Sequence, residues 1–490
     1  MPSLLSPIVK FGEWTPDTLD YDGGAAATVA RNCLPQGDNY KPFAAFGYTT
    51  AAISGTIVGL FSCRDTSDNV HVFVGTTTRL YKLSGTTWTD VTRASGNYTM
   101  GNDGWWSFTV YGNRVIATNY LDEVQSYVIG SSTQFAALAG SPPKARGVTV
   151  VNDFVVLYGI DGYSQRVQWS ALGNPTDWTS SAATQADFND IVGEGGAVQA
   201  VVGGQNTATV IMNKQIWRMD YVGPDSIFNF TLIEDKRGTS APRSVATDGS
   251  FVYYLSESGF MAFNGSTSVG IGHNKVDRYF AQRVDLGYRY SKTIGFVDPV
   301  NKCVMWAYPY NNGNQITHLI AYSWQDNRWT EIESSCAIVG QGLTVGYTVE
   351  DIGAIYPTLE EVPFSFDSPV WQGGQYVLCG VDATGRFGFY TAGNMTAVIA
   401  TKEAQLNQGG LAAVQSVIPV TDSDTVTIRV GSRMLQSASI NYTASQMPHA
   451  STGEANFRAV ARYHRAEVTV SGTWRVAQGV QFRYTAQGVR

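Results

Sequence analysis

Short apolar or alternating segments recur along most of this chain in groups of four, separated by polar turns. The first group reads IVGLFSC, VHVFVGT, RLYKLSG and TWTDVT (57–92), and its turns are rich in Asp, Asn, Ser, Thr and Gly. Such segments between such turns are typical of β-strands. Five further groups follow, beginning at residues 107, 147, 198, 244 and 292. The pattern predicts six consecutive units of four short strands.

A central aromatic residue marks the third strand of each group, and the fourth strand usually carries another. The leading aromatics recur at intervals of roughly 42 to 48 residues, with a last interval of about 59, and about 40–50 residues is the length of a propeller blade. One blade cannot bury its own apolar face, so these residues are expected to pack between blades. The pairs are Tyr81/Trp88, Tyr127/Phe135, Trp169/Trp178, Trp217/Phe230, Phe263/Val269 and Tyr322/Trp329.

The fold class predicted is therefore all-β. A β-propeller of six to seven four-stranded blades is expected over residues 43–403, with an irregular last blade at 336–403. Residues 272–285 carry apolar side chains at helical spacing and predict a helical insertion. Residues 1–42, broken by prolines, are expected to be an extended arm that lies on a neighbour or closes the ring. Cleanly alternating strands over 404–490 predict a small carboxy-terminal β-sandwich-like domain.

Charged residues make up only 15% of the chain, below the roughly 25% usual in soluble proteins. The net charge is −7, with +4 over residues 401–490 and −11 over residues 1–400. No general affinity for nucleic-acid phosphates is expected. A low surface charge favours burial against neighbouring subunits, although a polar, uncharged surface explains the composition equally well.

The five cysteines are scattered and lack CxxC spacing, so neither a disulfide framework nor a zinc site is predicted. The amino terminus shows no secretory signal, and no apolar run is long enough to span a membrane. Assembly in a reducing cytoplasm is expected.

Motifs for chemistry are few. Residues 101–106 (GNDGWW) partly resemble the box of sugar-hydrolysing propellers, but a turn with a packed tryptophan is the simpler interpretation. WD40 and kelch signatures are missing, as are GxSxG, P-loop and GxGxxG motifs. The acids closest to a calcium pattern resemble turn acids, and the histidines are isolated. These are Asp65, Asp68, Asp422 and Asp424, and His71, His273, His318, His449 and His464. The sequence predicts no enzyme, no cofactor and no catalytic, cofactor-binding or metal-binding residues.

Arginines alternate with aromatic residues near the carboxy terminus. One interpretation is a nucleic-acid surface with interleaved aromatics. The favoured one is a contact with a subunit or partner, in which the arginines pair with acids. The residues are Arg458, Arg462, Arg465, Arg475, Arg483 and Arg490, with Tyr463, Trp474, Phe482 and Tyr484.

Several longer strings occur in an order that resembles the tail hub or nozzle proteins of short-tailed bacteriophages, the packaged-DNA stabilisation group. The match is good over residues 170–335 and at the extreme carboxy terminus, and looser elsewhere. The strings are ALGNPTDWT (171–179), QIWRMDYVGP (215–224), RGTSAP (237–242), GHNKVDRYF (272–280), DPVNKCVMWAYP (298–309), AYSWQDNRWTEIE (321–333) and RYHRAEVTV…WRVAQGV (462–480).

The resemblance implies a propeller subunit of a ring, typically of six copies in the family, that surrounds the DNA channel of a virion tail. It implies that the ring retains packaged DNA and conducts it during ejection. The implied partners are an adaptor ring, tail fibres, tailspikes or a needle, and double-stranded DNA that passes without sequence-specific binding. The interruptions of the repeat are the expected docking sites: residues 1–42, 272–285 and 336–403 and the carboxy-terminal domain.

Two alternatives remain open at the level of sequence. The first alternative is a carbohydrate-binding or glycan-cleaving propeller of a receptor-recognition apparatus, with Trp105 and Trp106 as the candidate stacking pair. The second alternative is a solitary host enzyme, which requires acidic residues that converge at the central funnel of the propeller.

Overall fold

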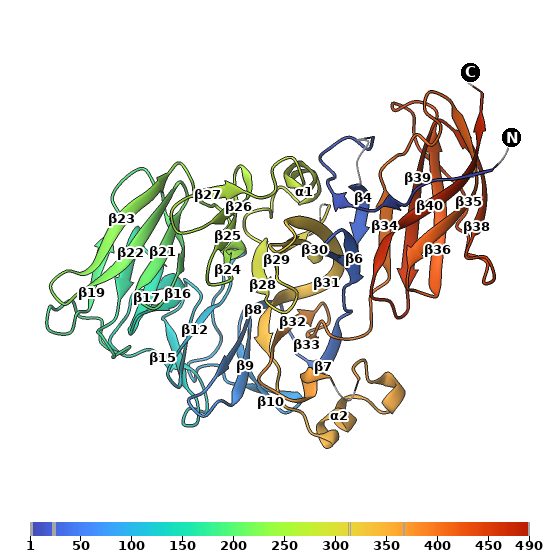
Figure 1. Ribbon diagram of the computed structural model, residues 1–490. Coiled ribbons are helices and arrows are strands. Elements are labelled where there is room, and N and C mark those ends of the chain that lie inside the picture. The colour runs from blue at the N-terminus through green and yellow to red at the C-terminus, as the bar shows by residue number, and fades with distance from the viewer. Residues whose placement is uncertain (1–2, 22–25, 312, 314, 366–367, 489–490) are drawn as a thin grey trace.

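The computed structural model describes residues 3–21, 26–311, 313, 315–365 and 368–488. Over these residues the chain forms a β-propeller of seven four-stranded blades joined to a β-sandwich (Figure 1). The predicted all-β propeller class is confirmed.

Each of the first six blades is an antiparallel meander that begins at the propeller axis and ends at the rim. First strands of neighbouring blades contact one another around the ring. Blades 1 to 3 are β8 (Ile57–Arg64), β9 (Val70–Thr76), β10 (Leu80–Ser84) and β11 (Thr87–Asp90); β12 (Ser107–Tyr111), β13 (Arg114–Thr118), β14 (Gln125–Val128) and β15 (Ala136–Ala137); and β16 (Ala145–Val151), β17 (Phe154–Ile160), β18 (Tyr163–Trp169) and β19 (Asp187–Asp190).

Blades 4 to 6 continue the six predicted groups of strands. They are β20 (Val198–Val202), β21 (Thr207–Met212), β22 (Gln215–Gly223) and β23 (Ile227–Asp235); β24 (Ala246–Thr247), β25 (Val252–Ser256), β26 (Gly259–Phe263) and β27 (Ser268–Gly270); and β28 (Ile294–Asp298), β29 (Cys303–Pro309), β30 (Ile316–Ser323) and the first half of β31 (Arg328–Leu343).

The seventh blade combines strands from both ends of the propeller sequence. The second half of β31 pairs with β32 (Tyr376–Asp382), which pairs with β33 (Arg386–Phe389). The fourth strand is β7 (Gly47–Ala52), which pairs antiparallel with β33. An amino-terminal strand therefore closes the ring, and it is residues 47–52 rather than residues 1–42 that do so.

The sandwich contains strands from the first 42 residues and from the last hundred. One sheet has the order β38 (Ala455–Ala461), β35 (Leu411–Thr421), β40 (Ala477–Gln487), β6 (Asn39–Pro42) and β5 (Cys33–Gln36), with β1 (Leu4–Leu5) and β2 (Val9–Lys10) also on β40. The other sheet has the order β4 (Ala26–Arg31), β34 (Ala397–Thr401), β39 (Tyr463–Ser471), β36 (Thr425–Arg433) and β37 (Asn441–Tyr442), with β3 (Glu13–Trp14) beside β4.

The domain boundaries differ from those expected at both ends. Within the expected arm 1–42, the described residues 3–21 and 26–42 are not extended from the molecule, because their strands complete both sheets of the sandwich. The sandwich also begins before residue 403, since β34 already pairs with β39 and β4. Pairing between segments several hundred residues apart leaves no local pattern in the sequence, which is why the boundary was misplaced.

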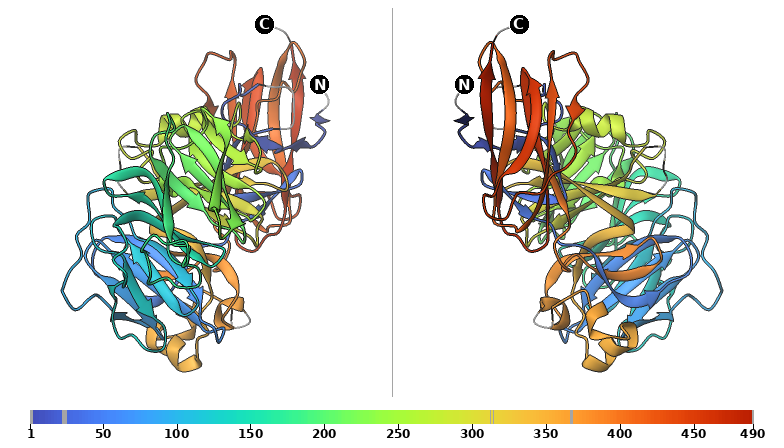
Figure 2. Two further views of the ribbon diagram at one scale, coloured as in Figure 1. Left: turned by 90° about the vertical axis from the view of Figure 1, so that its left-hand side faces the viewer. Right: turned by 90° about the vertical axis from the view of Figure 1, so that its right-hand side faces the viewer.

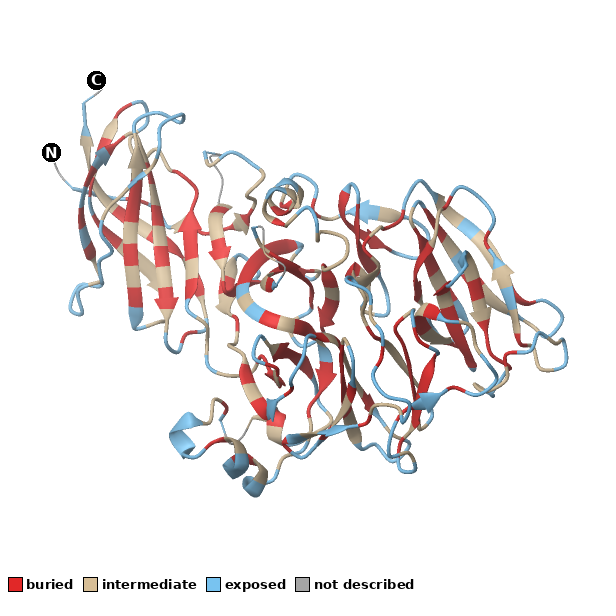
Figure 3. Cartoon of the chain, turned by 180° about the vertical axis from the view of Figure 1, so that it is seen from behind, coloured by how far each residue is buried: buried red, intermediate tan, exposed pale blue. Residues whose placement is uncertain are grey.

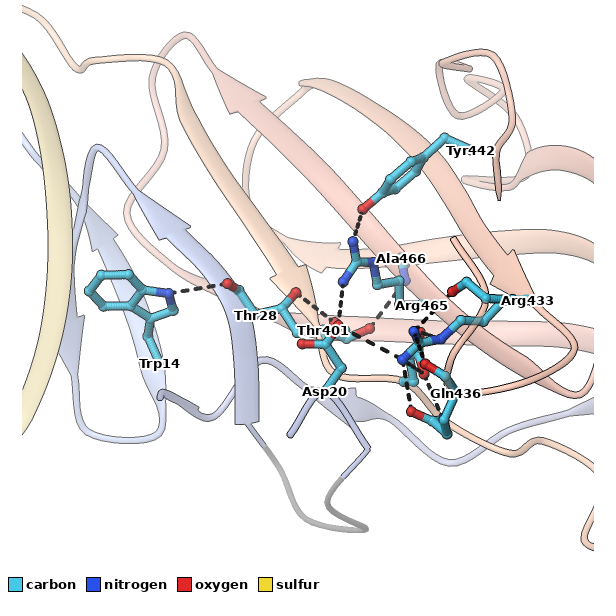
Figure 4. A network of polar contacts seen from close by, with 11 residues as sticks. Trp14, Asp20, Thr28, Thr401, Arg433, Gln436, Tyr442, Arg465 and Ala466 are labelled. Atoms are coloured by element: carbon cyan, nitrogen blue, oxygen red, sulfur yellow. Dashed lines mark hydrogen bonds and ion pairs between the residues drawn. The ribbon is translucent and has the colours of Figure 1, made fainter. Parts of the chain in front are cut away.

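Polar contacts fasten the amino-terminal segment to the carboxy-terminal strands (Figure 4). Thr28 Oγ1 donates to Thr401 O at 3.2 Å, and Ala466 N donates to Thr401 Oγ1 at 3.1 Å. Asp20 accepts Arg465 Nη1 at 3.4 Å and lies 4.0 Å from Arg433 Nη2. The contacts tie together residues from the two ends of the chain.

The predicted helical insertion is shorter than expected. The helix α1 covers only Asp277–Arg283, and Phe280 on it is buried against the aromatic core. Asp17 accepts hydrogen bonds from the backbone N–H groups of Arg278 and Tyr279 at 2.8 and 2.7 Å, where a capping side chain would lie. The helix is therefore committed to contacts within the chain.

Buried residues run along the strands of the blades and of the sandwich (Figure 3). Most of the repeated aromatics are among the buried residues, as the repeat predicts. Tyr127, Phe135, Trp169, Trp178, Phe263, Tyr322 and Trp329 are buried, whereas Tyr81, Trp88, Trp217 and Phe230 are partly exposed. Val269, the one non-aromatic member of the pairs, is exposed.

A 32-residue insertion (344–375) separates the first two strands of blade 7 and projects from the propeller at the end remote from the sandwich (Figure 2). It contains α2 (Val349–Ile355) and two 3₁₀ turns, η2 (Leu359–Glu361) and η3 (Pro369–Trp371). A capping box between Thr348 and Asp351 begins α2. We call residues 344–375 the blade-7 insertion.

Arg328 is the main polar link between blade 6 and the amino-terminal segment. Its guanidinium donates to the carbonyls of Gly12 and Gly37 and lies 4.7 Å from the centre of the Tyr40 ring. Arg328→Met is expected to lower the free energy of unfolding by about 2 kcal/mol, because the variant loses charge-assisted hydrogen bonds in a buried site. Urea denaturation measures the change. The control is Lys10→Met, which removes the exposed ion pair between Lys10 and Asp38 and should lower the free energy of unfolding by less than about 1 kcal/mol. An equal loss in both variants would contradict a special role of Arg328 in this contact.

Candidate functional site at one end of the propeller axis

A cavity of about 680 Å³ opens at one end of the propeller axis. The first strands all run in the same direction, so the residues that precede them meet at this end. The lining includes residues 52–58, which lead from β7 into β8, residues 101–104 before β12, Arg243 before β24 and residues 291–292 before β28. Thr77, residues 315–316, residues 336–337 of β31 and the turn 382–385 between β32 and β33 complete it. Hydroxyl and amide groups are frequent in this lining, among them Ser54, Thr56, Asn102 and Ser291.

Two partly buried arginines meet over one tryptophan beside this cavity. The guanidinium carbon of Arg243 lies 5.9 Å from the centre of the Trp105 ring, and that of Arg146 lies 5.6 Å from it. Arg146 also lies 5.3 Å from the Tyr120 ring. These distances are within the range of cation–π attraction. We call Trp105, Arg146 and Arg243 the arginine–tryptophan cluster.

The local sequence places the cluster residues at equivalent points of three blades. Trp105 lies two residues before β12, the first strand of blade 2, and Arg146 is the second residue of β16 in blade 3. Arg243 lies in the 3₁₀ turn η1 (Pro242–Ser244) before β24 in blade 5. Sequence reasoning missed both arginines. The available signal was their position, since each follows a proline-containing turn directly before or within a predicted first strand.

Neither guanidinium makes a hydrogen bond or an ion pair with any residue that the structure describes. Burial lowers the pKa of Arg243 to about 10, because a desolvated cation without a nearby acid is disfavoured. Each guanidinium offers five N–H donors. The cluster therefore presents positive charge that no acidic side chain of the described residues pairs with.

The acids of the cavity do not compensate this charge. Asp382 holds the β32–β33 turn: it accepts from Thr384 N at 2.8 Å and pairs with Arg386 Nε at 3.0 Å. Asp103 is exposed in the turn before β12. Cys336 also lines the cavity, and burial raises the pKa of its thiol to about 12, so it is not a thiolate nucleophile.

The two tryptophans considered for sugar stacking have different surroundings. Trp106 is buried against Gly59 and Gly75 and donates to Thr76 O at 2.9 Å, so its ring is not available to a ligand. Trp105 is partly exposed, but the two arginines lie against it. The GNDGWW segment is thus a turn with one packed tryptophan, as the simpler interpretation predicts.

The turn acids and histidines do not converge. Asp65 accepts from Ser67 N, Asn69 N and His71 Nε2 at 2.8, 2.9 and 3.0 Å, and Asp422 accepts from Arg475 N and Val476 N at 2.9 Å. His464 is buried in β39, His318 stacks on Tyr310, and His273 and His449 are exposed. Among the described residues, no group of three His, Cys, Asp or Glu side chains is placed to hold a metal ion.

Three of the six carboxy-terminal arginines pair with acids of the same chain. Arg465 pairs with Asp20, Arg475 with Asp422, and Arg483 with Glu454. Trp474 and Phe482 are buried, so they form no stacking platform. Arg458 is exposed and Arg462 partly so, and Arg490 lies outside the described residues. The acids expected on a neighbour are thus found within the chain for three of these arginines.

The strings that carry the phage-tail resemblance build turns and core contacts. In 171–179, Trp178 is buried and donates to Pro175 O at 3.0 Å; in 298–309, Asp298 accepts from the backbone of Val300 and Asn301 at 3.1 Å. The string 272–280 enters α1, and 321–333 forms the β30–β31 turn with the buried Trp329. The similarity therefore concerns the scaffold.

No helix in the described part of the chain combines the length and apolar character needed to cross a bilayer.

Comparisons with known proteins add a fold-level likeness. No protein-family model matches the chain, and no curated protein matches it significantly. Among solved structures, a chain of the mitotic checkpoint complex is 10% identical, with a TM-score of 0.41 and coverage of 73% of this chain and 98% of that chain. The extracellular domain of the putative hybrid two component system BT3049 from B. thetaiotaomicron is also 10% identical, with a TM-score of 0.41 and coverage of 84% and 49%. The computationally designed Ika8 protein is 10% identical, with a TM-score of 0.36 and coverage of 71% and 96%. Similarities of this size carry no argument about function.

Proposed function

We propose that this chain is a structural virion protein of a short phage tail, a hub or nozzle subunit that is not an enzyme. Six copies of it form a ring around the DNA channel, retain packaged DNA and conduct it during ejection. The observation that carries the proposal is the ordered set of strings over residues 170–335 and at the carboxy terminus. Their place in turns and core of the propeller supports it, because such positions specify a scaffold.

The proposed partners follow from this role. They are other copies of the chain, an adaptor ring, tail fibres, tailspikes or a needle, and double-stranded DNA that slides past. The assembly site is the host cytoplasm and the final location is the tail. A net charge of −7 supports the sliding of DNA, since an acidic wall repels phosphates.

Two of the four expected docking segments are occupied within the chain. Residues 1–42 belong to the sandwich, and α1 packs on the core. The blade-7 insertion stays exposed: Val349 is 76% and Leu359 69% exposed. The insertion has five acidic residues and no Lys or Arg. We infer that a tail partner with a basic, partly apolar surface docks on it.

The double variant Val349→Asp/Leu359→Asp tests this role in assembly. Both side chains are exposed, so the fold should be unaffected, whereas incorporation into virions should fall at least about tenfold because two apolar contacts become charged. Quantitative mass spectrometry of purified virions measures incorporation, and electron microscopy of the tails locates the chain. Val192→Asp, at an 83% exposed site after β19, is the matched control. If wild-type virions lack this chain altogether, the proposed function is wrong. If wild-type virions contain it and the double variant is incorporated equally well, the proposed docking site is wrong.

A second candidate function is a carbohydrate-binding or glycan-cleaving propeller of a receptor-recognition apparatus. The arginine–tryptophan cluster favours binding, since it offers donors for an acidic glycan. A glycan array with the purified protein tests this candidate. If no glycan binds, the structural role remains as the sole candidate function.

A further inference from the structure

The axial cavity has a charge imbalance that the proposed structural role does not use. Arg146 and Arg243 lie against the same indole ring, and neither has a hydrogen-bond or ion-pair partner among the residues described. Both arginines are only partly buried, and two like charges around one ring repel each other. A bound anion would relieve this repulsion by supplying a counter-charge to both guanidiniums.

The geometry points to a binding site, at the axial cavity, for a small oxyanion on a hydroxyl-rich body, that is, an acidic or phosphorylated sugar. Arg243 lines the cavity directly, and Arg146 approaches the same ring from blade 3. A guanidinium binds a carboxylate or phosphate through two parallel N–H···O bonds. Trp105 is a positioning residue in this site, because its ring orients both guanidiniums.

The rest of the lining suits the neutral part of such a ligand. Ser54, Thr56 and Thr77 bring hydroxyl groups from blade 1, Asn102 an amide from the turn before blade 2, and Ser291 and Thr384 further hydroxyls from blades 6 and 7. A volume of about 680 Å³ lies within the range of cavities that hold small molecules. Residues from five blades converge there, so the propeller itself shapes the site.

The low pKa of Arg243 agrees with this assignment. Desolvation is its only cause, and a bound oxyanion would raise this pKa again by restoring a counter-charge. The site does not depend on ring formation, since each residue named comes from one copy of the chain.

Isothermal titration calorimetry with the purified full-length chain tests the proposal with four probes. Glucuronate carries a carboxylate, glucose 6-phosphate carries a phosphate, inorganic phosphate lacks the sugar, and glucose lacks the charge. We expect binding of glucuronate, glucose 6-phosphate or both, weaker binding of inorganic phosphate and no binding of glucose. The charged sugar that binds more tightly shows whether the site prefers a carboxylate or a phosphate. Absence of binding for both charged sugars would overturn the proposal.

Arg243→Gln should weaken binding at least about tenfold, because it removes a charge-assisted bidentate contact. Arg218→Gln is the control, since Arg218 pairs with Asp220 on blade 4, outside the cavity lining. Equal affinities of the Arg243 variant and wild type would place the anion elsewhere, and equal losses in both variants would indicate general electrostatic attraction. Arg243→Lys keeps the charge without the fork and should give an intermediate loss. If the glutamine variant does not fold, Arg243→Lys tests the proposal alone. An affinity of Arg243→Lys equal to that of wild type would then contradict a bidentate contact by Arg243.

Discussion

Replacing Trp329 by alanine is expected to lower the free energy of unfolding by about 4 kcal/mol, the usual cost of removing a large buried aromatic. Trp329 is fully buried, and its Nε1–H donates to Ile271 O at 3.0 Å. Its ring lies 5.0 Å from that of Tyr322, 5.1 Å from that of Phe260 and 5.8 Å from that of Trp306, measured between ring centres. The substitution therefore leaves a cavity where blades 5 and 6 and the sandwich share one core.

Guanidinium denaturation followed by far-ultraviolet circular dichroism measures this loss. Trp217→Ala is the matched control, since Trp217 occupies the leading position of blade 4 but is only partly buried. We expect it to cost less than half as much. Similar costs for both would mean that the repeated aromatics contribute through blade geometry and not through burial.

Acidification should weaken the sandwich through His464. Burial lowers the pKa of this histidine to about 4, an effect that a backbone contact with Ala459 offsets in part. The ordinary value is near 6.5, so between pH 6.5 and pH 4 the unfolded chain binds a proton that the folded chain does not. Stability is therefore full above pH 6.5 and falls towards pH 4, by up to about 3 kcal/mol for this group.

Urea midpoints between pH 7 and pH 4 measure this dependence. His464→Leu should flatten the profile relative to wild type, whereas the exposed control His449→Gln should leave it unchanged. Burial also lowers the pKa of His318, so some slope should remain in the His464 variant. A wild-type profile that stays flat to pH 4 would contradict the assignment.

The sequence predicted those parts of the fold that are built from neighbouring segments. The six groups of strands correspond to blades 1 to 6, because each blade is a local meander with its own turns. The seventh blade and the sandwich are harder to predict, since each pairs strands from opposite ends of the sequence: β7 pairs with β33, and the amino-terminal strands β4 and β6 pair with β34 and β40. The blade-7 insertion also separates β31 from β32. Segment 47–52, GYTTAA, has no apolar alternation that would mark it as a closing strand.

The candidate site could not be predicted for a related reason. Trp105, Arg146 and Arg243 belong to blades 2, 3 and 5, and no motif spans them. They meet only because the blades close into a ring around one axis. The sequence marks Trp105 as half of an aromatic pair, but its arginine neighbours are visible only in three dimensions.

The placement of the amino-terminal strands constrains how the chain matures on the ribosome. Apart from pairs among themselves, β1 to β7 pair only with β31, β33, β34 and β40 over the described residues. Strands β1 to β7 therefore lack these partners until the ribosome has synthesised the chain from Arg328 onward, where β31 begins. At about 5–20 residues per second, translation of the intervening stretch takes roughly 15–55 s. During that interval the nascent chain carries unpaired strands, so chaperone supply and translation speed should govern its yield.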